Sequence, residues 1–181
     1  RGKKLLYGVA DEEGDLTYYI MSAENPEGSV SGRVTGKASG RLISDRVFVY
    51  DPEDSELLHT QGFYGKMLGG VLQLSLIEGC YLSSIGALDI VSAEGKTMSS
   101  DALKKFARVA QNEFDLRLVA FAYLRKRGLV VKTGFKYGTH FRVYEGSPDT
   151  CHARYLVHAV SASNVTMWPE ISRTVRLSGG V

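Results

Sequence analysis

The sequence predicts a mixed α/β (α+β) fold, with a small mixed α/β N-terminal subdomain and a C-terminal subdomain in which helices pack on a mixed central sheet. Three observations predict it. The 181 residues are enough for one large domain or two small ones. Short apolar runs bounded by glycines alternate with stretches of helical spacing. The composition, 44% hydrophobic and 23% charged, is that of a globular protein.

The first half begins with an expected hairpin. Residues 4–21, KLLYGVADEEGDLTYYIM, read as two apolar strands around an acidic turn. A linker at 22–30 and short strands within 31–50 follow. We expect DPEDSE at 51–56 to be a turn and 59–70 to be a glycine-rich connection. Apolar spacings of three and four predict a buried helix between residues 71 and 86, followed by a strand at 88–91.

The second half is expected to hold two helices and a sheet. Ser99 or Ser100 can cap a helix that runs to about residue 110. A second helix is expected over 115–127, with Gly128 at its end. Strands are expected in LVVKTGF, FRVY and RYLVHAV, and a short helix in ISRTVRLSGGV. The predicted division is a hairpin at 1–22, an N-terminal subdomain at 23–95 and a C-terminal subdomain at 96–181.

Charge is distributed unevenly along the chain. Residues 121–144 contain six Lys or Arg and no Asp or Glu, while acidic residues gather at 11–15 and 51–56. A basic face suggests a polyanionic partner, and an acidic turn suggests self-association, although a solvated basic face would look the same. Lys132 and Lys136 lie in the basic stretch. They are candidates for binding such a polyanion, for example RNA.

The sequence also argues against several classes of protein. No apolar run approaches 18 residues, so we expect no membrane span. No Cys or His spacing indicates a metal site, and we expect no cofactor. The sequence has two cysteines, too few for a disulfide framework, which favours a reducing, cytoplasmic setting.

The stretch FRVYEGSPDTCHARYLVHAV at 141–160 carries the candidate chemistry. Tyr144 and His152 lie on the two sides of its loop. RNA supplies its own nucleophile, the 2′-hydroxyl, so cleavage needs a base, an acid and a cation. An imidazole, with an ordinary pKa of about 6.5, can act as acid or base near neutrality. A phenol needs nearby cations to serve as a base. From the residues alone, both side chains could equally be ordinary hairpin residues.

The run GLVVKTGFKYGTHFRVYEG, continued by CHARYLVHAV, closely resembles the motif region of archaeal-type tRNA-splicing endonucleases. GFYGK at 62–66 and LQLSLIEGCYL at 72–82 resemble the first-half signature of that family. The resemblance covers most of the chain and implies a nuclease-type C-terminal subdomain. It implies Tyr144 as general base and His152 as general acid.

The same family places a third catalytic residue, a lysine, about 31 residues after the histidine. No lysine follows Lys136 here, but RGKKLLYGVADEEGD at the N-terminus resembles the segment expected after that point. The resemblance therefore points to Lys3, with Lys4 second. Either the chain is a circular permutant, or residues 1–22 end a preceding repeat of a longer tandem protein. In both cases the hairpin should complete a catalytic domain, its own or a neighbour's.

Partners also follow from the resemblance. Arg176 corresponds to an arginine that holds a flipped bulge base. The acidic turn, Asp11, Glu12, Glu13 and Asp15, corresponds to a loop that enters a basic pocket of a partner subunit. The implied activity is metal-independent cutting of bulge–helix–bulge exon–intron junctions in precursor tRNA, giving 2′,3′-cyclic phosphate and 5′-hydroxyl ends, by a homo- or hetero-oligomer. The alternatives are a non-catalytic structural subunit of the same assembly and an RNA-binding module without cleavage.

Overall fold

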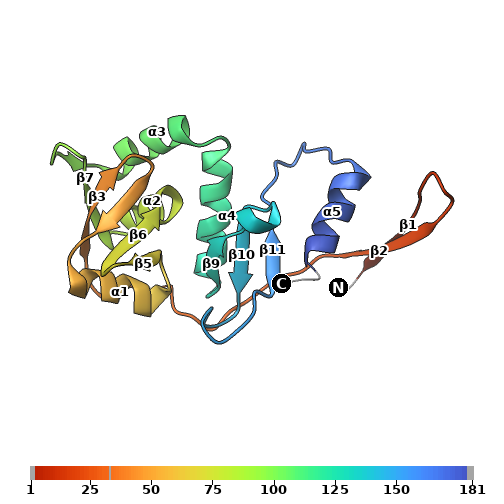
Figure 1. Ribbon diagram of the computed structural model, residues 1–181, viewed down its shortest axis with the longest axis horizontal. Helices are drawn as coiled ribbons and strands as arrows, with labels where there is room; N and C mark the ends of the chain where they lie inside the picture. Colours follow the sequence, from red (N-terminus) through yellow and green to blue (C-terminus); the bar gives the residue numbers. More distant parts are fainter. Residues whose placement is uncertain (1–2, 33, 179–181) are drawn as a thin grey trace.

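A computed structural model describes residues 3–32 and 34–178 and confirms the mixed α/β class (Figure 1). The first half is built on a six-stranded mixed sheet in the order β5-β6-β4-β3-β7-β8. Only the β3–β7 pair is parallel among the described strands of this sheet. The elements of this half are β3 (Ala38–Ile43), β4 (Arg46–Val49), α1 (Pro52–Gly62), β5 (Lys66–Leu68), β6 (Val71–Ser75), α2 (Leu76–Ser84), β7 (Leu88–Val91) and β8 (Thr97–Met98).

The second half places helices beside a three-stranded antiparallel sheet in the order β11-β10-β9. Of the two serines expected to cap α3, Ser99 is the cap, because its side chain accepts from the Ala102 N–H. The elements are α3 (Ser100–Ala110), α4 (Phe114–Lys126), β9 (Val130–Thr133), the 3-10 turn η1 (Phe135–Tyr137), β10 (Phe141–Tyr144), β11 (Tyr155–Val157) and α5 (Trp168–Ser178).

The predicted N-terminal hairpin is present as β1 (Lys4–Ala10) and β2 (Leu16–Ser22). Among the described strands these two pair only with each other. The hairpin projects from one end of the molecule, beyond α5 (Figure 1). Its contact with the body includes Trp168, whose ring lies 5.4 Å from the ring of Tyr7 and 5.3 Å from that of Tyr19.

Three expectations for the first half were wrong. Residues 59–70 are more than a connection, since residues 59–62 end helix α1 and Lys66–Leu68 form β5. Residues 51–56 begin helix α1, because Asp51 caps it by accepting from the Asp54 N–H and Pro52 occupies its first turn, where a missing N–H costs nothing. Residues 71–75 form a strand, and the helix starts only at Leu76. Ser75 marks the switch, since its side chain and that of Glu78 form a reciprocal capping box.

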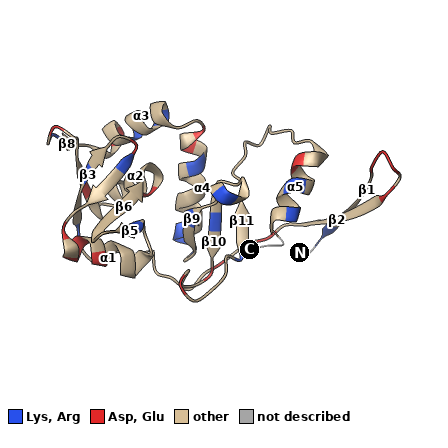
Figure 2. Cartoon of the chain, in the orientation of Figure 1, with Lys and Arg blue, Asp and Glu red and all other residues tan. Residues whose placement is uncertain are grey.

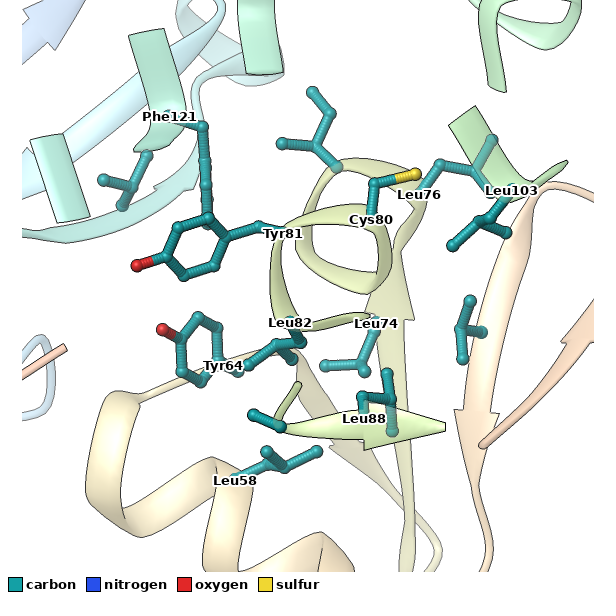
Figure 3. Close-up of a cluster of buried hydrophobic side chains, with 14 of the residues drawn as sticks. Leu58, Tyr64, Leu74, Leu76, Cys80, Tyr81, Leu82, Leu88, Leu103 and Phe121 are labelled. Carbon is teal, nitrogen blue, oxygen red and sulfur yellow. The ribbon is translucent and has the colours of Figure 1, made fainter. Parts of the chain in front are cut away.

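A shared hydrophobic core joins the two halves. Figure 3 shows the side chains of α2 meeting those of α1, β6, β7, α3 and α4. The aromatic contacts continue across the boundary: the ring of Phe121 lies 5.4 Å from Tyr81 and 6.0 Å from Phe141. The sheet that carries the candidate site is therefore fixed to the first half by packing.

A buried arginine adds a polar connection to this core. Arg125 is only 2% exposed; its Nε donates to the Tyr64 hydroxyl (3.2 Å) and its Nη1 to the Leu129 carbonyl (3.0 Å). Its guanidinium also lies over the Tyr64 ring, 4.4 Å from the centroid. Burial raises the pKa of Tyr64 to about 12, so this phenol stays neutral and donates or accepts as a hydroxyl.

Residues 25–30, here called the strap, run along the second half. Backbone bonds hold the strap, with Gly28 N–H donating to the Arg127 carbonyl (2.9 Å) and Val30 N–H to the Gly128 carbonyl (3.0 Å). Gly28 is required by this close approach, because a Cβ there would lie 2.2 Å from the Gly128 oxygen. The strap links the hairpin to the first half while lying against the sheet of the second.

Candidate active site

The two predicted catalytic residues share one strand–loop–strand unit. Tyr144 is the last residue of β10, pairs with Val130 and is 6% exposed. His152 lies in the loop that follows and is exposed. The loop closes where the Arg154 N–H donates to the Val143 carbonyl (2.9 Å), just before β11. The antiparallel pairing of β10 with β11 therefore sets both residues at one end of the sheet.

A clamp at the base of this loop was not foreseen from the sequence. The Tyr155 hydroxyl donates to the Glu145 carboxylate (2.9 Å), and this hydrogen bond raises the pKa of Tyr155. The strap reaches the same residue: both the N–H (2.9 Å) and the hydroxyl (3.1 Å) of Ser29 donate to the Glu145 carbonyl. Glu145 directly follows Tyr144, so these bonds fix the chain at the candidate base.

A cleft of about 660 Å³ lies between the two halves, and Tyr144 lines it. Arg142 and Tyr144 are two residues apart on β10 and so share a face, while Lys132 is the cross-strand partner of Arg142. The cleft extends to Arg46 and Lys66 on the first half. It is lined by more basic than acidic side chains: Arg46, Lys66, Arg117, Lys132 and Arg142 against Glu78 and Asp149.

Lys132 connects the two halves across this cleft. Its ammonium donates to the Gly65 carbonyl (2.8 Å), while the Gly65 N–H donates to the Glu78 carboxylate (2.8 Å). Burial lowers the pKa of Lys132, and the negative charge of Glu78 opposes that shift. GFYGK at 62–66 belongs to this junction, which the sequence alone did not locate.

The other two predicted RNA-binding residues, Lys136 and Arg176, lie on η1 and α5 and do not line the cleft. Lys136 is exposed within η1, and Arg142 lies with its guanidinium 5.7 Å from the Tyr137 ring. Arg176 is exposed on α5, where its Nε donates to the Ser172 carbonyl (3.4 Å). Helix α5 lies next to η1, so Lys136 and Arg176 belong to neighbouring elements (Figure 2).

Lys3 is placed apart from Tyr144 and His152 within this chain. It is exposed, immediately before β1, and the hairpin lies on the far side of α5 from β10 (Figure 1). Arg1 and Val181, the residues that a permutant would join, lie outside the described residues. Tyr144 and His152 thus belong to one strand–loop–strand unit, and Lys3 belongs to another element.

The acidic turn lies at the tip of the hairpin (Figure 2). Asp11 organises it, because its Oδ1 accepts from the N–H groups of Glu13 (3.0 Å) and Asp15 (2.9 Å), and Gly14 adopts a φ of 85°. Asp11 is therefore partly structural. Glu12 and Glu13 are exposed.

Two other kinds of site are absent from the part of the chain that the structure describes. Within residues 3–32 and 34–178, no group of three His, Cys, Asp or Glu side chains is arranged to hold a metal ion. Over the same residues, no helix has the length and apolar character needed to cross a membrane.

Comparisons with known proteins show the family to which the chain belongs. Residues 38–104 match the family model described as tRNA intron endonuclease, N-terminal domain, and residues 114–181 match the one described as tRNA intron endonuclease, catalytic C-terminal domain. The two models meet near the boundary between the halves of the fold. The chain therefore belongs to the tRNA intron endonuclease family.

Particular relatives agree. The chain is 37% identical over 185 residues to a protein of Methanococcoides burtonii and 39% identical over 184 residues to one of Methanosarcina mazei, both named tRNA-splicing endonuclease. A protein of the same name from Haloferax volcanii is 36% identical over 187 residues. These alignments cover 98–99% of this chain but 52–53% of each relative, so the chain spans about half the length of these relatives.

Proposed function

We propose that this chain is a catalytic unit of a metal-independent RNA endonuclease that cuts bulge–helix–bulge exon–intron junctions in precursor tRNA. The observation that carries the proposal is the position of Tyr144 and His152 on one clamped strand–loop–strand unit, inside the region that matches the catalytic-domain model. The basic cleft and the basic outer face supply charge for a polyanion.

In the proposed reaction, Tyr144 accepts the proton of a ribose 2′-hydroxyl. The resulting oxyanion attacks the adjacent phosphorus, and the bond from phosphorus to the 5′-oxygen breaks. His152, which is exposed to solvent, gives its proton to that leaving oxygen. The products are a 2′,3′-cyclic phosphate and a 5′-hydroxyl. A fixed ammonium stabilises the charge that develops on the phosphoryl oxygens.

Lys3 supplies that ammonium from a neighbouring unit, with Lys4 as the second candidate. Support comes from the hairpin, which stands apart from β10 in its own chain and exposes apolar side chains on the face away from α5. Leu6 is 66% exposed and Ile20 is 67% exposed. Such a face favours packing against another unit. The relatives, of which this chain spans about half, have room for a second unit.

The acidic turn would join such units. Its free carboxylates, Glu12 and Glu13, complement the cleft's first-half cations, Arg46 and Lys66. Entry of the turn at that side leaves the Tyr144 end for RNA. Lys132 is bonded to the first half, so it contributes charge to the cleft, while Lys136 and Arg176 are free to touch RNA.

The test is cleavage of a bulge–helix–bulge RNA in EDTA, with the ends of the products identified by mass. Cleavage with cyclic-phosphate ends is expected. His152→Ala should reduce the rate by about 10²- to 10⁴-fold, the usual contribution of a general acid. His158→Ala, which changes an exposed histidine just past β11, is the matched control and should retain activity.

Separation of Lys3 from Tyr144 specifically favours one alternative, a structural subunit that binds RNA without cutting it. Binding of the RNA without any product in EDTA would support that alternative against the catalytic proposal. A requirement for divalent ions, or full activity of His152→Ala, would contradict the proposed mechanism.

A further inference from the structure

The turn between β9 and β10 presents one aromatic ring to solvent. Phe135 is 86% exposed, unlike Phe121 and Phe141, which are buried. Among the described residues, no other ring and no cation stacks on it. A single exposed apolar residue needs no explanation by itself. The rigidity of the turn and its charged surroundings are what distinguish Phe135.

The turn is held in one shape by several backbone bonds. The Tyr137 N–H (2.8 Å) and the Thr139 N–H (3.3 Å) both donate to the Gly134 carbonyl, and the Gly138 N–H donates to the Phe135 carbonyl (3.1 Å). Gly134 cannot carry a side chain here, since a Cβ would lie 2.3 Å from the Thr139 hydroxyl. Phe135 is therefore presented on a fixed support, so little conformational entropy is lost when a ligand stacks on it.

Cations lie on the same strand pair as this ring and on the neighbouring helix. Lys136 is next in sequence and exposed, and Arg142 is anchored by its Nε to the Thr133 carbonyl (3.0 Å). Helix α5, which lies next to the turn, adds the exposed Arg173 and Arg176. No acidic residue occurs between positions 121 and 144.

An apolar ring among cations suits one type of ligand. A protein partner would be expected to bury a wider apolar patch, but within residues 134–140 Phe135 is the only exposed large apolar side chain, and Lys136 beside it is charged. A nucleobase needs only one planar apolar surface for stacking, and its flanking phosphates need cations. Bases can stack in this way only when they are unpaired, as in an RNA bulge or loop.

We propose that Phe135 is a stacking platform for an unpaired RNA base, with Lys136 and Arg142 binding the adjoining phosphates. The platform lies at the Phe141 end of β10 and Tyr144 at the other, about 10 Å along the strand at the usual rise per residue. A base held on Phe135 would thus position the strand relative to Tyr144. This inference rests on the proposed function, because it assumes an RNA substrate.

The experiment measures binding of the whole chain to a bulged RNA with 2′-deoxy sugars at the scissile positions, so that no cleavage can occur. Phe135→Ala should raise the Kd at least about fivefold, the lower range for loss of one stacked base, whereas Phe135→Trp should stay within about twofold of the original. A 2-aminopurine in the bulge should be quenched by the original and Trp proteins only. Val109→Ala, which removes an 89% exposed apolar residue on α3, is the matched control and should change nothing.

Salt dependence separates stacking from charge. Phe135→Ala should leave the slope of log K against log salt unchanged, while Lys136→Ala should reduce its size by about 0.7 to 0.9, as for one lost phosphate contact. If the original protein binds the RNA and Phe135→Ala leaves the Kd unchanged, the stacking proposal is contradicted and the proposed function is not. Failure of the original protein to bind the RNA would overturn both proposals. A smaller assembly mass for Phe135→Ala by light scattering would assign the ring to a contact between copies instead.

Discussion

At the scale of single residues, His140 combines a structural hydrogen bond with an unusual ionisation. Its Nδ1 accepts from the Ala159 N–H (3.1 Å), and its ring stacks on His158 with centroids 4.1 Å apart. An acceptor nitrogen must be unprotonated. Burial, then the nearby His158 and Arg117, lower the pKa of His140 to about 4, against a weaker opposing effect of Glu113. The fold therefore requires neutral His140.

This gives a prediction for stability against pH. The folded pKa of about 4 lies below the ordinary 6.5, so the unfolded chain binds more protons between these values. The contribution of His140 to stability is fully present above pH 6.5 and is lost as pH falls towards 4. His140→Gln cannot titrate, so its free energy of unfolding should fall less between pH 7 and pH 5 than that of the original. Urea unfolding at both values measures this, and an equal fall in the two proteins would contradict it.

At the scale of elements, the hairpin carries a charge prediction. The double change Glu12→Lys and Glu13→Lys leaves the Asp11 bonds that shape the turn intact but reverses its outward charge. Self-association should weaken by about tenfold or more, and the original assembly should weaken with rising salt. Glu53→Lys with Glu56→Lys on α1 gives the same change in net charge and is the control. Unchanged mass by light scattering for the hairpin variant would remove the turn from the interface.

The predicted bounds of the helices and strands agree with the structure in some places and not in others. Helices α3 and α4 were predicted to within one residue at each end, because caps and apolar spacing agree there. Helix α1 was missed because acidic residues beside Pro52 resemble a turn, although they also suit a helix N-terminus. The strand at 71–75 was absorbed into the following helix, yet Ser75 and Glu78 held the capping signal that separates them.

The sequence predicts only those parts of the candidate site whose residues lie close together along the chain. Tyr144 and His152 are close in sequence, so one loop brings them to one end of a sheet. The lining of the cleft by Arg46 and Lys66 depends on packing between the halves, which no short motif encodes. The position of Lys3 relative to the site depends on which surface packs against the hairpin. Such tertiary or quaternary contacts cannot be read from a short motif.

At the scale of the whole molecule, the proposal that Lys3 acts on a neighbouring unit makes a prediction about mixtures. Lys3→Ala and His152→Ala chains should each be inactive alone. A mixed assembly can combine the intact Lys3 of one chain with the intact Tyr144 and His152 of the other, so mixing should restore up to about a quarter to a half of the original activity. Cleavage assays on co-refolded chains measure this. No restoration, in a mixture proven to contain hetero-assemblies, would place the lysine in its own chain's site.

The contact between the hairpin and Trp168 has a consequence for how the protein is made. Trp168 lies 149 residues after Tyr19 in the sequence, so it is synthesised well after the two tyrosines that pack against it. At usual rates of synthesis, the β1–β2 hairpin is made on the order of ten seconds or more before this partner. Until Trp168 has been made, the rings of Tyr7 and Tyr19 lack this contact.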